Sequence, residues 1–302
     1  MADPNPTCPQ CGSEKTKLKY FQSGLGEGHR KANFAPRLAH KAMLPYRFWR
    51  CLNCDLCFNT AHLPEAQLFT LYQNAQFNHA SLSAQAAQTY LHLLRPYLAQ
   101  DGKFLDIGCS DGAFLQLAHT AFPYLELFGL EPSQAAIRQI HPALSAQITS
   151  EPWAQHLYPA HYFDFIMLGQ TLEHLANPLA KMQDILYWLR PGGKLIIFAH
   201  NYHALINRLL GRRSPIYDAQ HCQIYSPKAL TYLCRGLKKI VLKSYVNFYQ
   251  ASYLWALVQD AYPFCQRFKY PADLAMLKLP LPAGNIFALF EQTSLLTAYS
   301  PG

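Results

Sequence analysis

Hydrophobic residues beyond residue 103 fall into short runs that alternate with amphipathic segments. Four runs are rich in Leu, Ile and Phe and lack strict polar alternation: "KFLDIG", "LELFGLE", "FDFIMLG" and "KLIIFAH". Such runs are typical of strands that helices cover on both faces. Three segments between them have helical spacing, the last with a Pro-Gly-Gly stop: "GAFLQLAHTAF", "PSQAAIRQIH" and "NPLAKMQDILYWLRPGG". This alternation predicts an α/β fold with a doubly wound parallel sheet.

The same patterning divides the chain into three parts. Residues 1–62 are rich in Cys, Pro, Gly and basic residues and show little periodicity. Residues 63–102 carry apolar residues at helical spacing, which predicts a helical linker or cover. Residues 103–302 then form the α/β domain, in which residues 250–285 are an aromatic-rich insertion.

Composition narrows the class of protein without identifying a partner. Half of the 302 residues are hydrophobic, and no run approaches the length of a membrane-spanning helix. The opening residues "MADPNPTCPQ" lack the apolar core of a signal peptide, so we expect a cytoplasmic protein with no membrane partner. Its nine cysteines should then be reduced or metal-bound. A net charge of +8 permits an anionic partner such as RNA, but scattered basic residues are usually a solvated face.

The segment "DIGCSDG" lies where the first strand of the domain gives way to a helix. In doubly wound sheets, ligands bind beyond the carboxyl ends of the strands. Gly108 and Gly112 would let the backbone turn sharply and approach a ligand. Ser110 occupies the place of the second glycine of a G-x-G-x-x-G motif, which argues against a dinucleotide.

Two acids accompany this turn, Asp106 within it and Glu131 at the end of the second strand. An acid after the second strand can accept both hydroxyls of a ribose. The combination suits an adenosine attached to a cationic group, whereas strand-end capping is the alternative role for both acids.

These features together resemble the class I S-adenosylmethionine-dependent methyltransferases. Four motifs carry the resemblance, in the expected order over residues 103–198: "FLDIGCSDGAFL", "LFGLEPS", "FDFIMLGQTLEHLANP" and "LRPGGKLII". The resemblance implies a Rossmann-like, seven-stranded sheet whose last two strands, "KKIVLKSYVNF" and "GNIFALFEQT", form an antiparallel edge hairpin. It also implies S-adenosyl-L-methionine as the cofactor.

By this resemblance, the first motif holds the methionine part of the cofactor, and Glu131 takes the ribose hydroxyls. Glu151 and Trp153 would lie near the adenine, with an ordinary surface loop as the alternative. Gln170 and Thr171 would line the sulfonium side. The expected cofactor-binding residues are Asp106, Gly108, Cys109, Ser110, Gly112, Glu131, Glu151 and Gln170.

The amino-terminal part carries two C-x-x-C knuckles, Cys8–Cys11 and Cys51–Cys54. Four thiolates in two close pairs suit a tetrahedral zinc ion, which predicts a small zinc ribbon with Cys8, Cys11, Cys51 and Cys54 as ligands. Such a closed shell leaves no open coordination position, so the metal would be structural. A redox dithiol is the rival interpretation. Cys57 fits an apolar strand position better than a ligand position.

Methyl transfer to a hydroxyl or an acidic carbon would need a general base. The candidates are His174 after the fourth strand of the domain, His200, Tyr202 and His203 after the fifth, and His221 and Tyr225 in "DAQHCQIYSPKAL". The resemblance favours a structural or cofactor-side role for His174. It places His221 at the mouth of the pocket, which makes His221 our preferred base, with a structural role as the alternative.

Three hypotheses remain for the acceptor. A zinc ribbon ahead of this pattern resembles bacterial methyltransferases that act on sugars and other small metabolites, which favours a small-molecule acceptor. An RNA methyltransferase is the second hypothesis, with the ribbon gripping the RNA backbone, although "GQTL" stands where an "NPPY"-type loop would be. A non-catalytic, cofactor-binding partner protein is the third. The insertion is either extra core or oligomer surface, or a lid in which Tyr249, Tyr253, Trp255 and Tyr262 stack on the acceptor.

Overall fold

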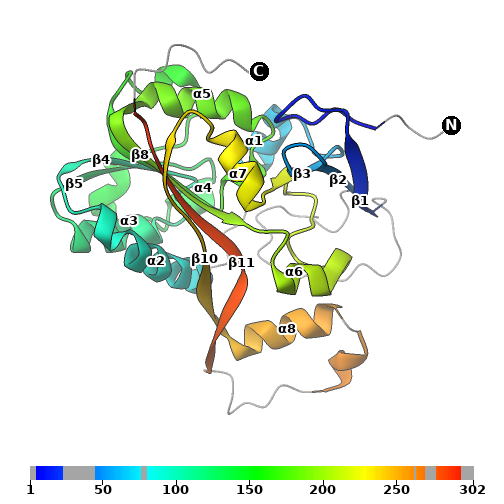
Figure 1. Cartoon of the computed structure of the whole chain (residues 1–302). Helices are drawn as coiled ribbons and strands as arrows, with labels where there is room; N and C mark the ends of the chain where they lie inside the picture. The colour runs from blue at the N-terminus through cyan, green and yellow to red at the C-terminus, as the bar shows by residue number, and fades with distance from the viewer. Residues whose placement is uncertain (1–4, 23–44, 76–79, 262, 269–276, 294–302) are drawn as a thin grey trace.

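The computed structural model describes residues 5–22, 45–75, 80–261, 263–268 and 277–293. Seven strands form the central sheet: β4 (Gly102–Ile107), β5 (Leu125–Leu130), β6 (Ile148–Thr149), β7 (Phe163–Gly169), β8 (Leu189–His200), β10 (Lys238–Gln250) and β11 (Lys278–Glu291). Their order is β10-β11-β8-β7-β4-β5-β6 (Figure 1). The strands from β8 to β6 are parallel, and β11 is antiparallel to both of its neighbours. The predicted seven-stranded α/β fold is confirmed.

Helices cover both faces of this sheet. The α-helices of the described residues are α1 (Glu65–Gln73), α2 (Ala80–Leu94), α3 (Ala113–Ala121), α4 (Gln134–Ile137), α5 (Pro178–Trp188), α6 (Leu205–Leu210), α7 (Pro227–Leu233) and α8 (Ala251–Ala261). Phe104 of β4 and Phe165 of β7 belong to the core that includes residues of α2 and α3. Leu105 and Ile166, the next residues along, belong to the opposite core with α5 and α7. Since both faces are buried, polar alternation is absent from these strands.

Two of the predicted helices are shorter than the sequence pattern indicates. In "PSQAAIRQIH", α4 covers a single turn, and His141 is already extended at ψ 133° ahead of Pro142. α5 ends at Trp188 and does not reach the Pro-Gly-Gly, which instead lies inside β8. In both segments, proline disfavours helical backbone at the residue that precedes it.

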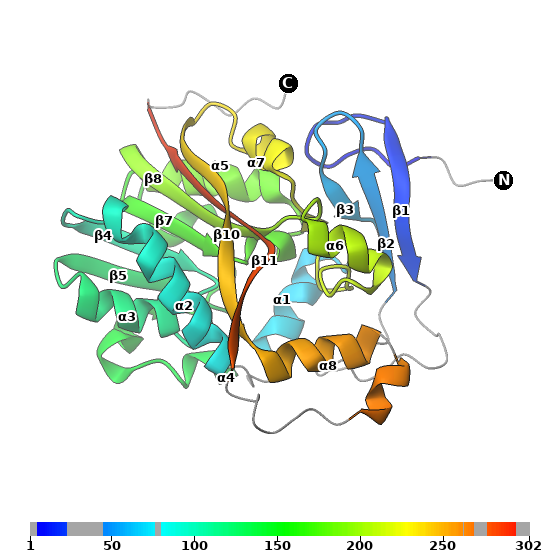
Figure 2. The same ribbon diagram turned by 60° about the horizontal axis from the view of Figure 1, so that its bottom comes forward.

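A second, four-stranded sheet lies beside α6 and α7 (Figure 2). Its order is β1 (Thr16–Gln22), β2 (Tyr46–Cys51), β3 (Cys57–Asn59) and β9 (Gln223–Ile224). The last of these strands comes from the methyltransferase-like part of the chain, more than a hundred residues further on. Buried side chains of this sheet share one apolar cluster with α5 and α7.

The β10–β11 hairpin continues past the edge of the central sheet, and α8 begins at its tip (Figure 2). The insertion therefore starts with a helix. Of the aromatic residues expected in a lid, Tyr262 lies outside the described residues, as do the side chains of Tyr249 and Tyr253. Among the helices that the structure describes, none is both long and apolar enough to cross a bilayer.

Candidate functional site

The glycine turn after β4 has the backbone conformation that its sequence predicts. Gly108 and Gly112 have φ values of 76° and 71°, in the left-handed region that favours glycine. A Cβ at Gly108 would collide with the side chain of Thr171 in the loop after β7. Ser110 also has a positive φ of 56°, which is uncommon for a residue with a side chain. The loops after β4 and β7 are therefore packed closely together.

Glu131 connects this turn to the end of β5. The carboxylate is 1% exposed, and each of its oxygens accepts a backbone hydrogen bond. Oε2 accepts from the Ser110 amide at 2.8 Å, and Oε1 accepts from the Ser133 amide at 2.9 Å. A carboxylate has about four lone-pair positions, so this arrangement leaves capacity for further donors. Glu131 thus stabilises the glycine turn by accepting a hydrogen bond from the Ser110 amide.

Asp106 lies deeper, at 3% exposure. Burial, and secondarily the charge of Glu131, raise the pKa of Asp106 to about 8 from its ordinary 3.8. The carboxyl is therefore mostly protonated at neutral pH in the protein without ligand. A cation bound nearby would favour its ionised form.

The structure brings most of the expected cofactor residues together but not all of them. Gln170 has a positive φ of 55°, and its amide donates to the Phe198 carbonyl at the end of β8. This places Gln170 and Thr171 beside the glycine turn. Glu151 is exposed after β6, and Trp153 stacks on Trp188 with ring centroids 5.7 Å apart.

Three of the candidate histidines form a cluster at the carboxyl ends of β7 and β8. His174 lies on the short 3-10 helix η5 (Leu172–His174), His200 ends β8, and His221 lies just before β9. The ring centroid of His221 is 4.8 Å from that of His174 and 5.6 Å from that of His200. His203 lies apart from the cluster and contacts Asp55 at 2.8 Å.

Hydrogen bonds define which ring nitrogen is free in this cluster. His221 Nδ1 lies 2.7 Å from the Ile216 carbonyl, so Nδ1 carries the proton and Nε2 holds the lone pair. His200 Nδ1 is paired in the same way with Asn285 Oδ1 at 3.0 Å. Burial lowers the pKa of His200 and so favours its neutral ring, although the charge of Glu173 acts in the opposite direction. His200 can therefore present a basic Nε2 here, and His221 does so in the tautomer that donates from Nδ1 to the Ile216 carbonyl.

Some residues of this cluster were not predicted from the sequence. Tyr72 of α1 places its hydroxyl 2.8 Å from His174 Nδ1. Glu173 is fully buried, and its Oε1 accepts from the His200 amide. Among the described residues, its Oε2 has no hydrogen-bond partner. Only Glu173 had a local signal, its position beside His174 in "LEHL".

The two cysteine knuckles meet as predicted. The four Sγ atoms of Cys8, Cys11, Cys51 and Cys54 lie within 4.8 Å of one another. Cys8 and Cys54 are 3.6 Å apart, and Cys11 and Cys51 are 3.5 Å apart. A tetrahedral zinc ion with bonds of about 2.3 Å requires sulfur separations of about 3.8 Å, so these donors fit the ion.

Two further observations fit thiolate ligation at this cluster. The hydrogen bond with Cys54 lowers the pKa of Cys8 to about 5, so one thiol ionises readily. Cys57 lies on β3, and burial raises its pKa to about 12, as expected for an apolar strand position.

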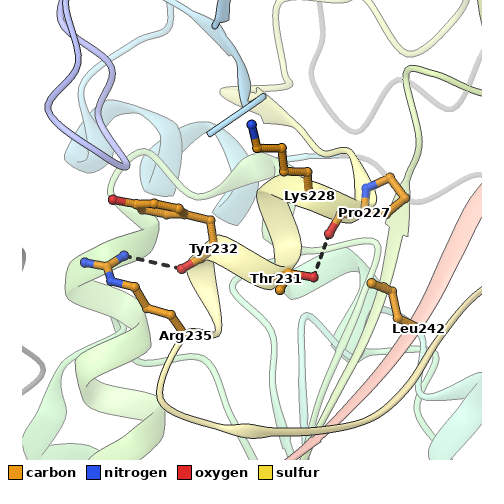
Figure 3. A pocket seen from close by; sticks show the side chains of 6 residues that line it. All are labelled: Pro227, Lys228, Thr231, Tyr232, Arg235 and Leu242. Atoms are coloured by element: carbon orange, nitrogen blue, oxygen red, sulfur yellow. Dashed lines mark hydrogen bonds between the residues drawn. The ribbon is translucent and has the colours of Figure 1, made fainter. Parts of the chain in front are cut away.

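An open pocket lies on the surface between α7 and β10 (Figure 3). It is lined by Pro227, Lys228, Thr231, Tyr232, Arg235 and Leu242. None of the predicted cofactor, metal or base residues lines it. We therefore place the candidate active site at the strand ends.

The model of a methyltransferase-domain family matches residues 77–237, more than half of the chain. An uncharacterised methyltransferase of Schizosaccharomyces pombe is 25% identical over 127 residues, covering 38% of this chain and 45% of that protein. A malonyl-[acyl-carrier protein] O-methyltransferase of Paenibacillus sp. is 25% identical over 147 residues, covering 41% and 53%. The chain thus spans about half the length of these curated relatives.

A similar fold occurs among solved structures. A Bacillus halodurans protein assigned as a methyltransferase has a TM-score of 0.50 and 11% identity, covering 68% of this chain and 100% of its own. At this identity the likeness concerns the fold alone.

Proposed function

We propose that this chain, which belongs to the methyltransferase-domain family, transfers a methyl group from S-adenosylmethionine to a small molecule, such as a sugar or another secondary metabolite. One observation carries the proposal. His221 is only 7% exposed and lies against His174 and His200 at the ends of β7 and β8. An enclosed base of this kind suits an acceptor group that can enter the interior of the protein.

We propose that the cofactor lies over the glycine turn. The cofactor supplies an electrophilic methyl group on a sulfonium ion. Asp106 would oppose its positive charge, the backbone of Gly108 to Gly112 would approach its methionine part, and Glu131 would accept its ribose hydroxyls. The left-handed backbone at Ser110 and Gln170 supports this location, since strained positions cluster at binding sites. Glu151 would contribute from the rim.

We propose that His221 acts as the general base when the acceptor needs one. Its Nε2 holds the lone pair because Nδ1 donates to Ile216. A proton from an acceptor hydroxyl would move to this nitrogen as the methyl group is transferred in line. His174, bonded to Tyr72, would orient the cofactor side of the pocket.

We propose that residues 1–62 form a structural zinc module, that residues 63–102 cover the sheet, and that residues 103–302 form the catalytic domain, with 250–285 as extra core, an oligomer surface or a lid. The metal would hold Cys8, Cys11, Cys51 and Cys54. Purified protein should contain about one zinc ion per chain by elemental analysis. Replacing Cys11 and Cys54 by Ser should remove the zinc, and retention of zinc by that variant would refute the ligand set.

One observation keeps an RNA acceptor as the second candidate. The exposed residues Arg208, Arg212 and Arg213 lie on α6 and the 3-10 helix η6 (Gly211–Arg213), and the backbone of Gly211 approaches Tyr20 of β1. A basic face next to the zinc module could grip a phosphate backbone, and its RNA affinity would fall steeply with salt.

The test is methyl transfer from labelled S-adenosylmethionine to a fractionated metabolite pool, run beside total RNA. We expect label in a small-molecule fraction, with no transfer by a His221→Asn variant that still binds the cofactor. Label in RNA alone would overturn the small-molecule proposal. Tight cofactor binding with label in neither pool would support a non-catalytic partner protein instead.

A further inference from the structure

We propose that the cysteine module is a support for the acceptor-side histidine, and that Asp55 and Asn59 are its positioning residues. The structural coupling stands on contacts alone. Its consequence for catalysis rests on the proposed function of His221. The segment in question, residues 201–226, runs from the end of β8 to the start of α7 and carries His221.

Asp55 fastens both ends of this segment to the second knuckle. Asp55 directly follows Cys54, is 8% exposed and has a left-handed φ of 64°. Its own backbone amide donates to the Cys51 carbonyl. Its Oδ1 accepts from the Tyr202 hydroxyl at 2.7 Å, and its Oδ2 lies 2.8 Å from His203 Nε2. Its carbonyl accepts from the Ser226 hydroxyl at 3.1 Å.

The contacts of Asp55 lie at the two ends of residues 201–226. Tyr202 and His203 lie two and three residues after His200, the last residue of β8. The Ser226 hydroxyl also accepts from the Ala229 amide and so caps α7. A single buried acid thus bonds to the residues that leave the central sheet and to the residue that re-enters a helix.

Asn59 of β3 supports the middle of the segment. Its Nδ2 donates to the His221 carbonyl at 3.3 Å, and its amide donates to the Cys222 carbonyl at 2.8 Å. On the core side, the Cys222 amide donates to the Glu173 carbonyl at 2.8 Å. The peptide next to His221 is therefore held between the cysteine module and the loop after β7 that carries Glu173. Pairing of β3 with β9 extends this attachment over the next two residues.

The geometry implies that residues 201–226 and the glycine turn after β4 are held in place independently of each other. The knuckle fixes Asp55 and the start of β3, so metal loss should release residues 201–226 and disturb His221. Glu131 and the glycine turn belong to β4 and β5, which lie beyond β7 in the sheet order and bond to each other. Cofactor affinity should therefore survive an injury that frees the histidine.

The test uses two variants of the full chain, Asp55→Asn and Asn59→Ala, with Glu14→Gln as the matched control. Glu14 is an exposed acid of the same module. The Asp55 change presents an amide donor to donors that now bond a carboxylate. We expect zinc content and cofactor affinity close to wild type, while amide exchange over residues 216–226 accelerates by about tenfold or more. Exchange over residues 104–110 should not change.

A second readout reports on the histidine directly. The ¹⁵N shifts of the His221 ring, assigned with a His221→Gln sample, should show one tautomer in wild type and a mixture in both positioning variants. Chelation of the metal from wild-type protein should reproduce the exchange pattern, which covers the case in which one variant fails to fold. Unchanged exchange over 216–226 after chelation, or an unchanged His221 tautomer in both variants, would overturn the proposal. Failure of wild-type protein to bind cofactor would refute the proposed function and leave these results standing.

Discussion

The proposed cofactor side and the proposed acceptor side of this molecule are built in different ways. The cofactor side is local, because its acids and glycines come from two adjacent parallel strands, and Glu131 bonds to residues 21 and 2 positions away. The acceptor side is assembled from remote segments, with Tyr72 reaching His174 across 102 positions and Asn59 reaching His221 across 162. A local site can be read from one motif, whereas an assembled site depends on the whole fold. Variants that separate cofactor binding from transfer therefore test this contrast.

The largest effect should come from His221→Asn. We expect methyl transfer to the identified fraction to fall by about 10²-fold or more, because the base is lost, while cofactor affinity stays unchanged. The measurement is initial rate with labelled cofactor, beside calorimetry. His156→Asn, a change at an exposed histidine, is the control. Full activity of the His221 variant would assign the base elsewhere or show that none is used.

Glu131→Ala should affect the proposed cofactor side and weaken cofactor binding. It leaves the Ser110 and Ser133 amides without their acceptor, at about 1–3 kcal/mol for each buried donor, and removes the ribose partner. Cofactor affinity measured by calorimetry should fall by about 100-fold. Glu126→Ala, at a surface acid of the same strand, should leave it intact. If both variants bind equally well, the cofactor does not lie over this turn.

The raised pKa of Asp106 predicts pH-dependent binding. The free protein holds this proton up to about pH 8, and the cationic cofactor favours the ionised form, so binding releases a proton. Affinity should rise between pH 6 and pH 8 by up to about tenfold per unit. Calorimetry in buffers of different ionisation enthalpy measures the proton released. Asp106→Asn should flatten the profile, and a flat wild-type profile would contradict this placement.

The pH dependence that Asp106 gives to folding stability has the opposite sign to the pH dependence that it gives to cofactor affinity. Between its unfolded pKa near 3.8 and its folded pKa near 8, the folded protein binds more protons than the unfolded chain. Its contribution to the free energy of unfolding therefore falls as pH rises through this window. Thermal unfolding of wild type compared with Asp106→Asn should show this slope in wild type only.

The smallest effect should come from Glu151→Ala. Glu151 is exposed, so its contact with the adenine end would be screened by water, and we expect cofactor affinity to weaken by about threefold. The comparison with Glu131 is made in the same calorimetric series. A loss as large as that for Glu131 would show that the loop after β6 closes over the cofactor.

Sequence patterning predicted the parallel strands, the glycine turn and the cysteine cluster, because each depends on short-range rules. Apolar runs identify buried strands, and C-x-x-C pairs bring their own sulfurs together. The end of α5 at Trp188 was missed because Pro191 disfavours helical backbone at Arg190 before it, whereas α4 ends at Ile137, before the restriction that Pro142 places on His141. The roles of Asp55 and Asn59 could not be predicted, since each depends on partners that only the folded chain brings near. The same is true of Glu173 and Tyr72.

The pairing of strand β9 with β3 of the N-terminal sheet has a consequence for how the protein is synthesised. A ribosome must add more than 160 residues after β3 before the two residues that complete that sheet emerge. Strand β3 is thus synthesised long before it reaches its final pairing with β9. Excision of residues 1–62 would likewise leave β9 without β3, the strand with which it pairs.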